Sequence, residues 1–121
     1  ALKKARRSLV THLKFWMKSA RSMPRKIELI SEAQVDLLGA VEYYEDQVEG
    51  LGLDFEQEIR SALRIIQQSP EMWPKRHQDV RWYRVERFPY VIHYKLMNDC
   101  IKVIAVAHTS RRPDYWKKRK S

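Results

Sequence analysis

The chain has 121 residues, with 44% hydrophobic and 11% aromatic side chains and a formal net charge of +9. This length favours a single domain with one modest core, and no apolar run approaches the ~20 residues of a membrane-spanning helix. The single cysteine, Cys100, excludes a disulfide within the chain and favours a reducing compartment, so we expect a cytoplasmic protein.

Charge is divided along the sequence into three blocks. Residues 1–26 carry nine basic residues and no acid, residues 27–71 carry two basic and eleven acidic residues, and residues 72–121 carry thirteen basic and four acidic residues. The net charges of the blocks are therefore +9, −9 and +9. The acidic block could bind a basic segment and the last block a polyanion, or both could be ordinary solvated faces.

The first block contains a basic amphipathic segment at residues 1–22. Such a helix could bind a groove, a membrane surface or nucleic acid, or act as a transit peptide. Met23 resembles a natural start, so we interpret residues 1–22 as an extension that is not native to a domain spanning residues 23–121. The apolar residues of the segment fall on one helical stripe: Leu9, Val10, Leu13, Trp16 and Met17.

Two helices are predicted after a short strand at Arg25–Ile30. The first begins at Ser31, because Ser31 and Gln34 fit a capping box in which side chains satisfy backbone amides at the helix start. Gly50-Leu51-Gly52 ends it, since glycine is favoured just past a helix end. A second helix follows and ends at Ser69-Pro70, which makes an antiparallel helical hairpin.

Three strand-forming runs follow a predicted loop at residues 70–76. They are Val80–Arg87, Tyr90–Leu96 and Cys100–Ala107, and interruptions of hairpin length separate them. The apolar stripes of the helices need a surface to cover, and the sheet is the available one. The predicted fold is therefore α+β: a strand, a helical hairpin and a three-stranded antiparallel meander, with the helices packed on one face of the sheet.

Four motifs stand out along the chain: GAVEYY at residues 39–44, GLGLDF at 50–55, RFPYVIHY at 87–94 and HTSRRPDYW at 108–116. Together they resemble the RelE/ParE superfamily of toxins from bacterial type II toxin-antitoxin systems, and the ParE-like branch most closely. The resemblance covers about residues 23–118, and it implies a small cytoplasmic toxin that inhibits growth and that a cognate antitoxin neutralises, with no membrane partner. It also implies one of two targets, DNA gyrase or the ribosome with its mRNA.

The ribonuclease alternative requires a base, a cation and an acid around the scissile phosphate. Trp82 and Val91 occupy strand positions where ribosome-dependent members carry basic residues, which weakens this alternative. No metal or cofactor is predicted, because the four histidines and the cysteine show no ligand spacing and no glycine-rich phosphate loop is present. The candidate catalytic residues, for a metal-independent endoribonuclease, are Arg84, His93, Arg111 and Tyr115.

The gyrase alternative needs no catalytic set, and the resemblance implies that the end of the chain contacts the target. Its candidate target-binding residues are Arg111, Arg112, Tyr115 and Trp116. A third alternative is an inactive relic that only binds antitoxin in a hetero-oligomer. The candidate antitoxin-binding residues are Leu38, Tyr44, Trp82, Tyr83 and Tyr90.

Overall fold

The computed structural model describes residues 25–112 and 115–119, so the segment 1–22 lies outside the described residues. The chain begins with strand β1 (Lys26–Leu29) and continues with the helices α2 (Ser31–Gln47) and α3 (Leu51–Gln68). Four strands follow: β2 (Lys75–His77), β3 (Val80–Arg84), β4 (Tyr90–Leu96) and β5 (Cys100–His108). This is the α+β arrangement that the sequence predicts.

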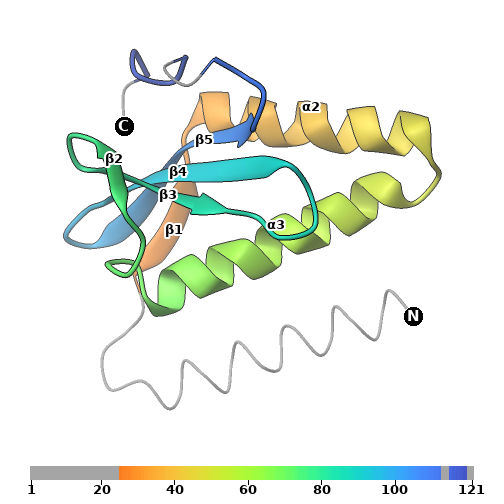
Figure 1. Ribbon diagram of the computed structural model, residues 1–121. Coiled ribbons are helices and arrows are strands. Elements are labelled where there is room, and N and C mark those ends of the chain that lie inside the picture. Colours follow the sequence, from red (N-terminus) through yellow and green to blue (C-terminus); the bar gives the residue numbers. More distant parts are fainter. Residues whose placement is uncertain (1–24, 113–114, 120–121) are drawn as a thin grey trace.

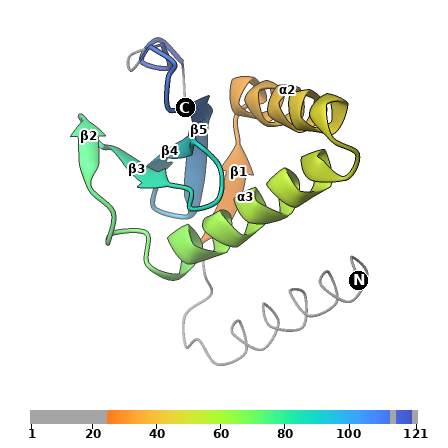
Figure 2. The same ribbon diagram turned by 45° about the vertical axis from the view of Figure 1, so that its right-hand side comes forward.

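The five strands form one sheet in the order β1-β5-β4-β3-β2. β1 runs parallel to β5, whereas the other neighbours are antiparallel, so the predicted meander is present as β3, β4 and β5. Both helices lie on the same face of the sheet (Figures 1 and 2). No helix in residues 25–112 or 115–119 is long and apolar enough to cross a membrane.

The predicted loop at residues 70–76 is partly wrong, because Lys75–His77 forms the edge strand β2. Hydrogen bonds donated by residues of β3 hold the start of β2 and the residues before it in place. The Trp82 amide donates to the Pro74 carbonyl at 3.0 Å, and Arg81 Nη1 donates to the Trp73 carbonyl at 2.6 Å. Strand β2 is hard to predict from the sequence because it has only three residues and follows Pro70 and Pro74 closely.

The predicted capping box is also wrong. The N-cap of α2 is Ile30, which makes no side-chain cap hydrogen bond, and Ser31 is already helical. The Ile30 amide donates to the Val103 carbonyl at 3.1 Å, which continues the pairing of β1 with β5 up to the helix start. Gln34 Nε2 instead donates to the Leu29 carbonyl at 3.0 Å.

The predicted strand Val80–Arg87 is shorter in the structure and ends at Arg84. The Val85 amide donates to the Tyr90 carbonyl at 2.9 Å, and this bond closes the turn around Phe88-Pro89. Arg84 Nη1 donates to the carbonyls of Val85 and Phe88, so its guanidinium braces the same turn.

The core lies between α3 and the sheet. Phe55, Ile59 and Ile66 of α3 are buried against Ile92 and other strand residues. By contrast, only two alanines of α2 are fully buried, its Leu37, Val41 and Tyr44 are half-buried against the core, and large apolar residues remain on its outer surface. The exposed apolar residues of α2 are Val35, Leu38 and Tyr43, with Val48 just after it.

Candidate functional site

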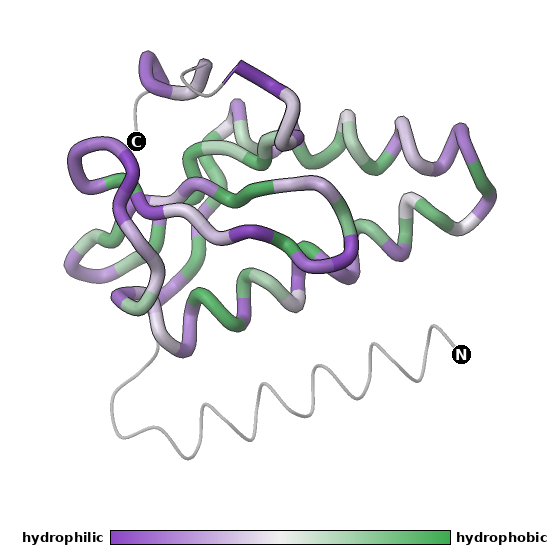
Figure 3. Tube along the Cα trace, in the orientation of Figure 1, coloured by the Kyte–Doolittle hydropathy of each residue, from purple (hydrophilic) through white to green (hydrophobic). Residues whose placement is uncertain are grey.

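A cavity of about 230 Å³ lies at the end of the sheet where the chain leaves β5. Strands β2, β3, β4 and β5 and the segment after β5 line it, and Figure 3 shows hydrophilic residues concentrated along β2 and that final segment. We call this cavity the arginine pocket. It brings together all six residues that the sequence predicts for catalysis or target binding: Arg84, His93, Arg111, Arg112, Tyr115 and Trp116.

Four arginines line the arginine pocket, and one of them, Arg76 of β2, was not predicted from the sequence. Two are stacked on aromatic rings. Arg76 Cζ lies 4.6 Å from the Trp82 ring centroid, and Arg111 Cζ lies 3.8 Å from the Tyr115 ring centroid. Stacking fixes the plane of a guanidinium while leaving its N–H edge available for hydrogen bonds.

His93 and Trp116 form the buried wall of the arginine pocket. The residues are 3% and 2% exposed, and their rings stack with centroids 4.7 Å apart. Trp116 therefore offers little ring surface to a target as the structure stands, and its role in target binding stays a prediction. Burial, and then the cations of Arg76 and Arg119, lower the pKa of His93 to about 4, so its ring is neutral at pH 7.

The depressed pKa of His93 makes the stability of the fold depend on pH. Between the folded value of about 4 and the ordinary 6.5, the unfolded chain binds more protons, so stability is lost as pH falls through this range. Lowering the pH from 7 to 5 is expected to remove about 2 kcal/mol of unfolding free energy through this residue. Urea denaturation should show that loss in the wild type but not in His93→Gln, and equal pH dependence of the two proteins would contradict it.

The other candidate proton-transfer groups of the arginine pocket have partners. His108 Nδ1 accepts from the Ser110 amide at 3.0 Å and lies 2.7 Å from Ser110 Oγ. The Tyr115 hydroxyl donates to Asp36 Oδ2 at 3.3 Å, and burial together with the Asp36 charge raises the pKa of Tyr115 to about 12. With its hydroxyl bonded to Asp36 and its pKa raised, Tyr115 is not poised to exchange a proton at neutral pH.

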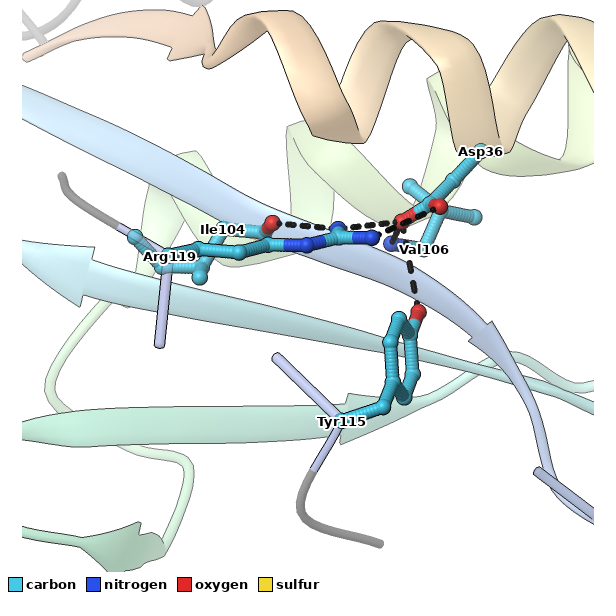
Figure 4. Close-up of polar contacts among 5 residues, drawn as sticks. All are labelled: Asp36, Ile104, Val106, Tyr115 and Arg119. Carbon is cyan, nitrogen blue, oxygen red and sulfur yellow. Dashed lines mark hydrogen bonds and ion pairs between the residues drawn. The ribbon is translucent and has the colours of Figure 1, made fainter. Parts of the chain in front are cut away.

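Asp36 of α2 anchors the segment after β5 (Figure 4). Its Oδ2 accepts from Arg119 Nη1 at 2.7 Å and from the Val106 amide at 3.1 Å, while Oδ1 accepts from Arg119 Nη2 at 3.1 Å. Arg119 Nη1 also donates to the Ile104 carbonyl at 3.0 Å. With Tyr115, these bonds tie α2, β5 and the wall of the arginine pocket together.

Asp36 was not singled out from the sequence, although a signal was present. It lies three residues after Ala33 and four before Ala40, on the buried stripe of α2. An acid on such a stripe needs a cationic partner in the fold. The residue that supplies this partner, Arg119, is 83 positions away in the sequence, so local patterns could not identify it.

A second cavity, of about 270 Å³, lies between α2 and the sheet. We call it the α2 groove. Val35, Gly39 and Tyr43 line its helix side, and it shares His108 and Arg111 with the arginine pocket. Exposed apolar residues of α2, Val35 and Tyr43, therefore line a cavity that also contains Arg111 of the arginine pocket.

The candidate antitoxin-binding residues differ in burial and in location. Leu38 is 61% exposed on α2, whereas Tyr83 and Tyr90 are buried in the core. Tyr44 is half-buried among the rings of the core, and half-buried Trp82 lines the arginine pocket under Arg76 rather than the α2 groove. Their roles in antitoxin binding stay predictions, and Leu38 offers the largest free surface.

Comparisons with known proteins found a matching family model and a similar fold. A family model described as "ParE toxin of type II toxin-antitoxin system, parDE" matches residues 27–113. The fold is similar to a solved structure described as "Chromosomal ParDE TA system from P. aeruginosa", with a TM-score of 0.60 and 19% sequence identity over 69% of this chain and 95% of that chain. No curated protein matches.

Proposed function

Because this chain belongs to the ParE toxin family of type II toxin-antitoxin systems, we propose that it inhibits growth by poisoning DNA gyrase and that a cognate antitoxin neutralises it. One observation supports a binding function over RNA cleavage. In the arginine pocket the cations are exposed, while the predicted catalytic residues His93 and Tyr115 are respectively buried and hydrogen-bonded to Asp36. A poison that acts by binding needs exposed cations but no group that transfers protons.

The ribonuclease alternative has less support. General acid-base cleavage of RNA needs groups that reach the substrate and exchange protons near neutral pH. His93 is 3% exposed, with a pKa of about 4, and the Tyr115 hydroxyl donates to Asp36. Trp82 and Val91 line the pocket where this alternative needs cations.

The proposed function is tested by inducing the full chain and following DNA and RNA integrity in the same cells. We expect growth arrest, induction of the DNA-damage response and DNA breaks covalently linked to gyrase. A gyrase-cleavage reaction with purified protein should reproduce the breaks. Cleaved mRNA with intact DNA would instead establish the ribonuclease alternative, and normal growth with antitoxin binding retained would establish the relic.

The α2 groove is the surface we propose for the antitoxin. Val35 and Tyr43 line the groove and provide apolar contacts, Leu38 is exposed beside it on the same helix, and Arg111 in the groove lining provides a cation. A partner helix with apolar residues followed by an acid matches both features, and an acidic or mixed antitoxin tail would also be captured quickly by the basic toxin. Because Arg111 belongs to both cavities, an antitoxin in this groove would also cover the rim of the arginine pocket.

Leu38→Asp is expected to weaken antitoxin binding without unfolding the protein. Leu38 is 61% exposed, so a polar replacement costs little in the free chain but places an unpaired charge in the interface. We expect Kd to rise on the order of 100-fold, measured by calorimetry with the cognate antitoxin. Met72→Asp, at a similarly exposed apolar residue that is not on α2, is the matched control. An unchanged Kd for Leu38→Asp would reject the exposed face of α2 beside the groove as the antitoxin site.

A further inference from the structure

We propose that the arginine pocket is a binding site for the phosphodiester backbone of DNA. This inference rests on the proposed function, because a gyrase poison acts on an enzyme that holds DNA. The pocket is lined by four exposed arginines from three segments, namely Arg76 on β2, Arg84 on β3 and Arg111 and Arg112 after β5, and none of its lining residues is acidic. Four like charges around one small cavity repel one another, and a bound anion relieves that repulsion.

The arginines differ in their availability. Arg84 is committed to the carbonyls of Val85 and Phe88, so it contributes charge but few free donors. Arg76 and Arg111 are stacked on Trp82 and Tyr115, and their N–H edges remain available. Within residues 25–112 and 115–119, no carboxylate forms an ion pair with Arg76, Arg111 or Arg112.

The arrangement suits a phosphate better than a carboxylate. A planar carboxylate is satisfied by one bidentate guanidinium, whereas phosphate oxygens project tetrahedrally and can accept from donors on several sides. Arg76 approaches the cavity from β2, and Arg111 and Arg112 approach it from the segment after β5. The surrounding sequence extends the same charge, since residues 72–121 have a net charge of +9.

The size of the cavity indicates how DNA would be held. A volume of about 230 Å³ has room for a phosphate with part of its sugar but not for a duplex. The contact is therefore to the backbone at the rim, with neutral Val91 and Ala107 beneath. Backbone contacts of this kind do not read base sequence, but they make binding strongly dependent on salt.

The test compares two double variants that each remove two positive charges. Arg76→Gln/Arg112→Gln changes the pocket, and Arg60→Gln/Arg64→Gln changes α3, away from it. Both keep residues 1–24, so the charge of that segment is the same in every protein. The probe is a fluorescent DNA duplex of about 20 base pairs, titrated at several salt concentrations, with anisotropy as the readout.

We expect the pocket variant to bind DNA on the order of tenfold more weakly at low salt and to flatten the log-log salt slope by roughly one to two. The α3 variant should stay within about twofold of the wild type, because its arginines are not expected to contact phosphate. Equal losses in both variants, or no loss in the pocket variant, would overturn the proposal. The single variant Arg112→Gln, with its urea midpoint checked, repeats the test if the double variant is unstable.

Two further arms separate DNA from other anions, and a third separates this inference from the proposed function. RNA of the same sequence that binds about tenfold more tightly than DNA, or polyglutamate that competes as well as DNA does, would overturn the assignment to DNA.

In the gyrase-cleavage reaction, the pocket variant should trap fewer breaks than the α3 variant. If the pocket variant traps breaks normally, the DNA site is wrong and the gyrase function stands. If the wild type traps none, the function itself fails, whatever the binding data show.

Discussion

Replacing Asp36 with alanine is expected to lower the free energy of unfolding by about 3–5 kcal/mol, because it leaves a largely buried guanidinium without its counter-ion. The side chains of Asp36 and Arg119 are 7% and 14% exposed. The hydrogen bond to Asp36 raises the pKa of Arg119, so the arginine stays charged and cannot relieve its isolation by losing a proton. The Val106 amide and the Tyr115 hydroxyl lose an acceptor in the same change.

Urea denaturation measures this effect, and Asp46→Ala is the matched control. Asp46 is an exposed acid on the same helix, so its removal should change the free energy of unfolding by no more than about 0.5 kcal/mol. We also expect Asp36→Ala to weaken DNA binding at the arginine pocket, since Arg111 stacks on the ring of Tyr115 that Asp36 holds. Comparable stabilities for the two variants would show that the anchor contributes little.

The sequence was sufficient for the elements whose signals are local. The apolar stripe of the second predicted helix corresponds to α3, which buries Phe55 and Ile59 in the structure, and two runs of strand-forming residues predicted β4 and β5. Interactions between separate segments were missed. Strand β2 depends on hydrogen bonds from Arg81 and Trp82, and it was predicted as a loop. The start of α2 was correctly predicted at Ser31, but the bond from Ile30 to Val103, and not a capping box, holds the chain there.

The contrast between local sequence signals and interactions between separate segments also explains which residues of the candidate site could be predicted. The pair Arg111 and Arg112 stands out in the sequence, and Arg84 is brought to it because β3 and β5 flank β4 in the sheet. Arg76 was read as part of a loop, so its place in the pocket could not be foreseen. Burial was the other unknown, since a tryptophan near the end of the chain gives no sign that its ring packs on His93.

Gly52→Ala is expected to lower the free energy of unfolding by about 3 kcal/mol, at the upper end of the range for overpacking. A Cβ at this position would lie 2.5 Å from the Val41 carbonyl oxygen and 2.9 Å from Glu45 Cβ. The Val41 oxygen belongs to the backbone of α2, so the clash can be relieved only if α3 moves away from α2. Glu45 also accepts from the Gly52 amide at 3.0 Å, and this bond at the start of α3 would be disturbed as well.

Gly39→Ala is the matched control for that prediction, and its expected sign is opposite. No heavy atom lies within 4 Å of a Cβ at Gly39, so the added methyl group should stabilise α2 by up to about 1 kcal/mol. Urea denaturation of the two variants beside the wild type decides the matter, and stabilisation by both would contradict the close approach of the helices. Gly50, at φ 87°, makes the left-handed turn between the helices, and Gly52 lets them touch. The Gly50-Leu51-Gly52 motif, predicted as a helix stop, therefore also sets how closely α3 packs against α2.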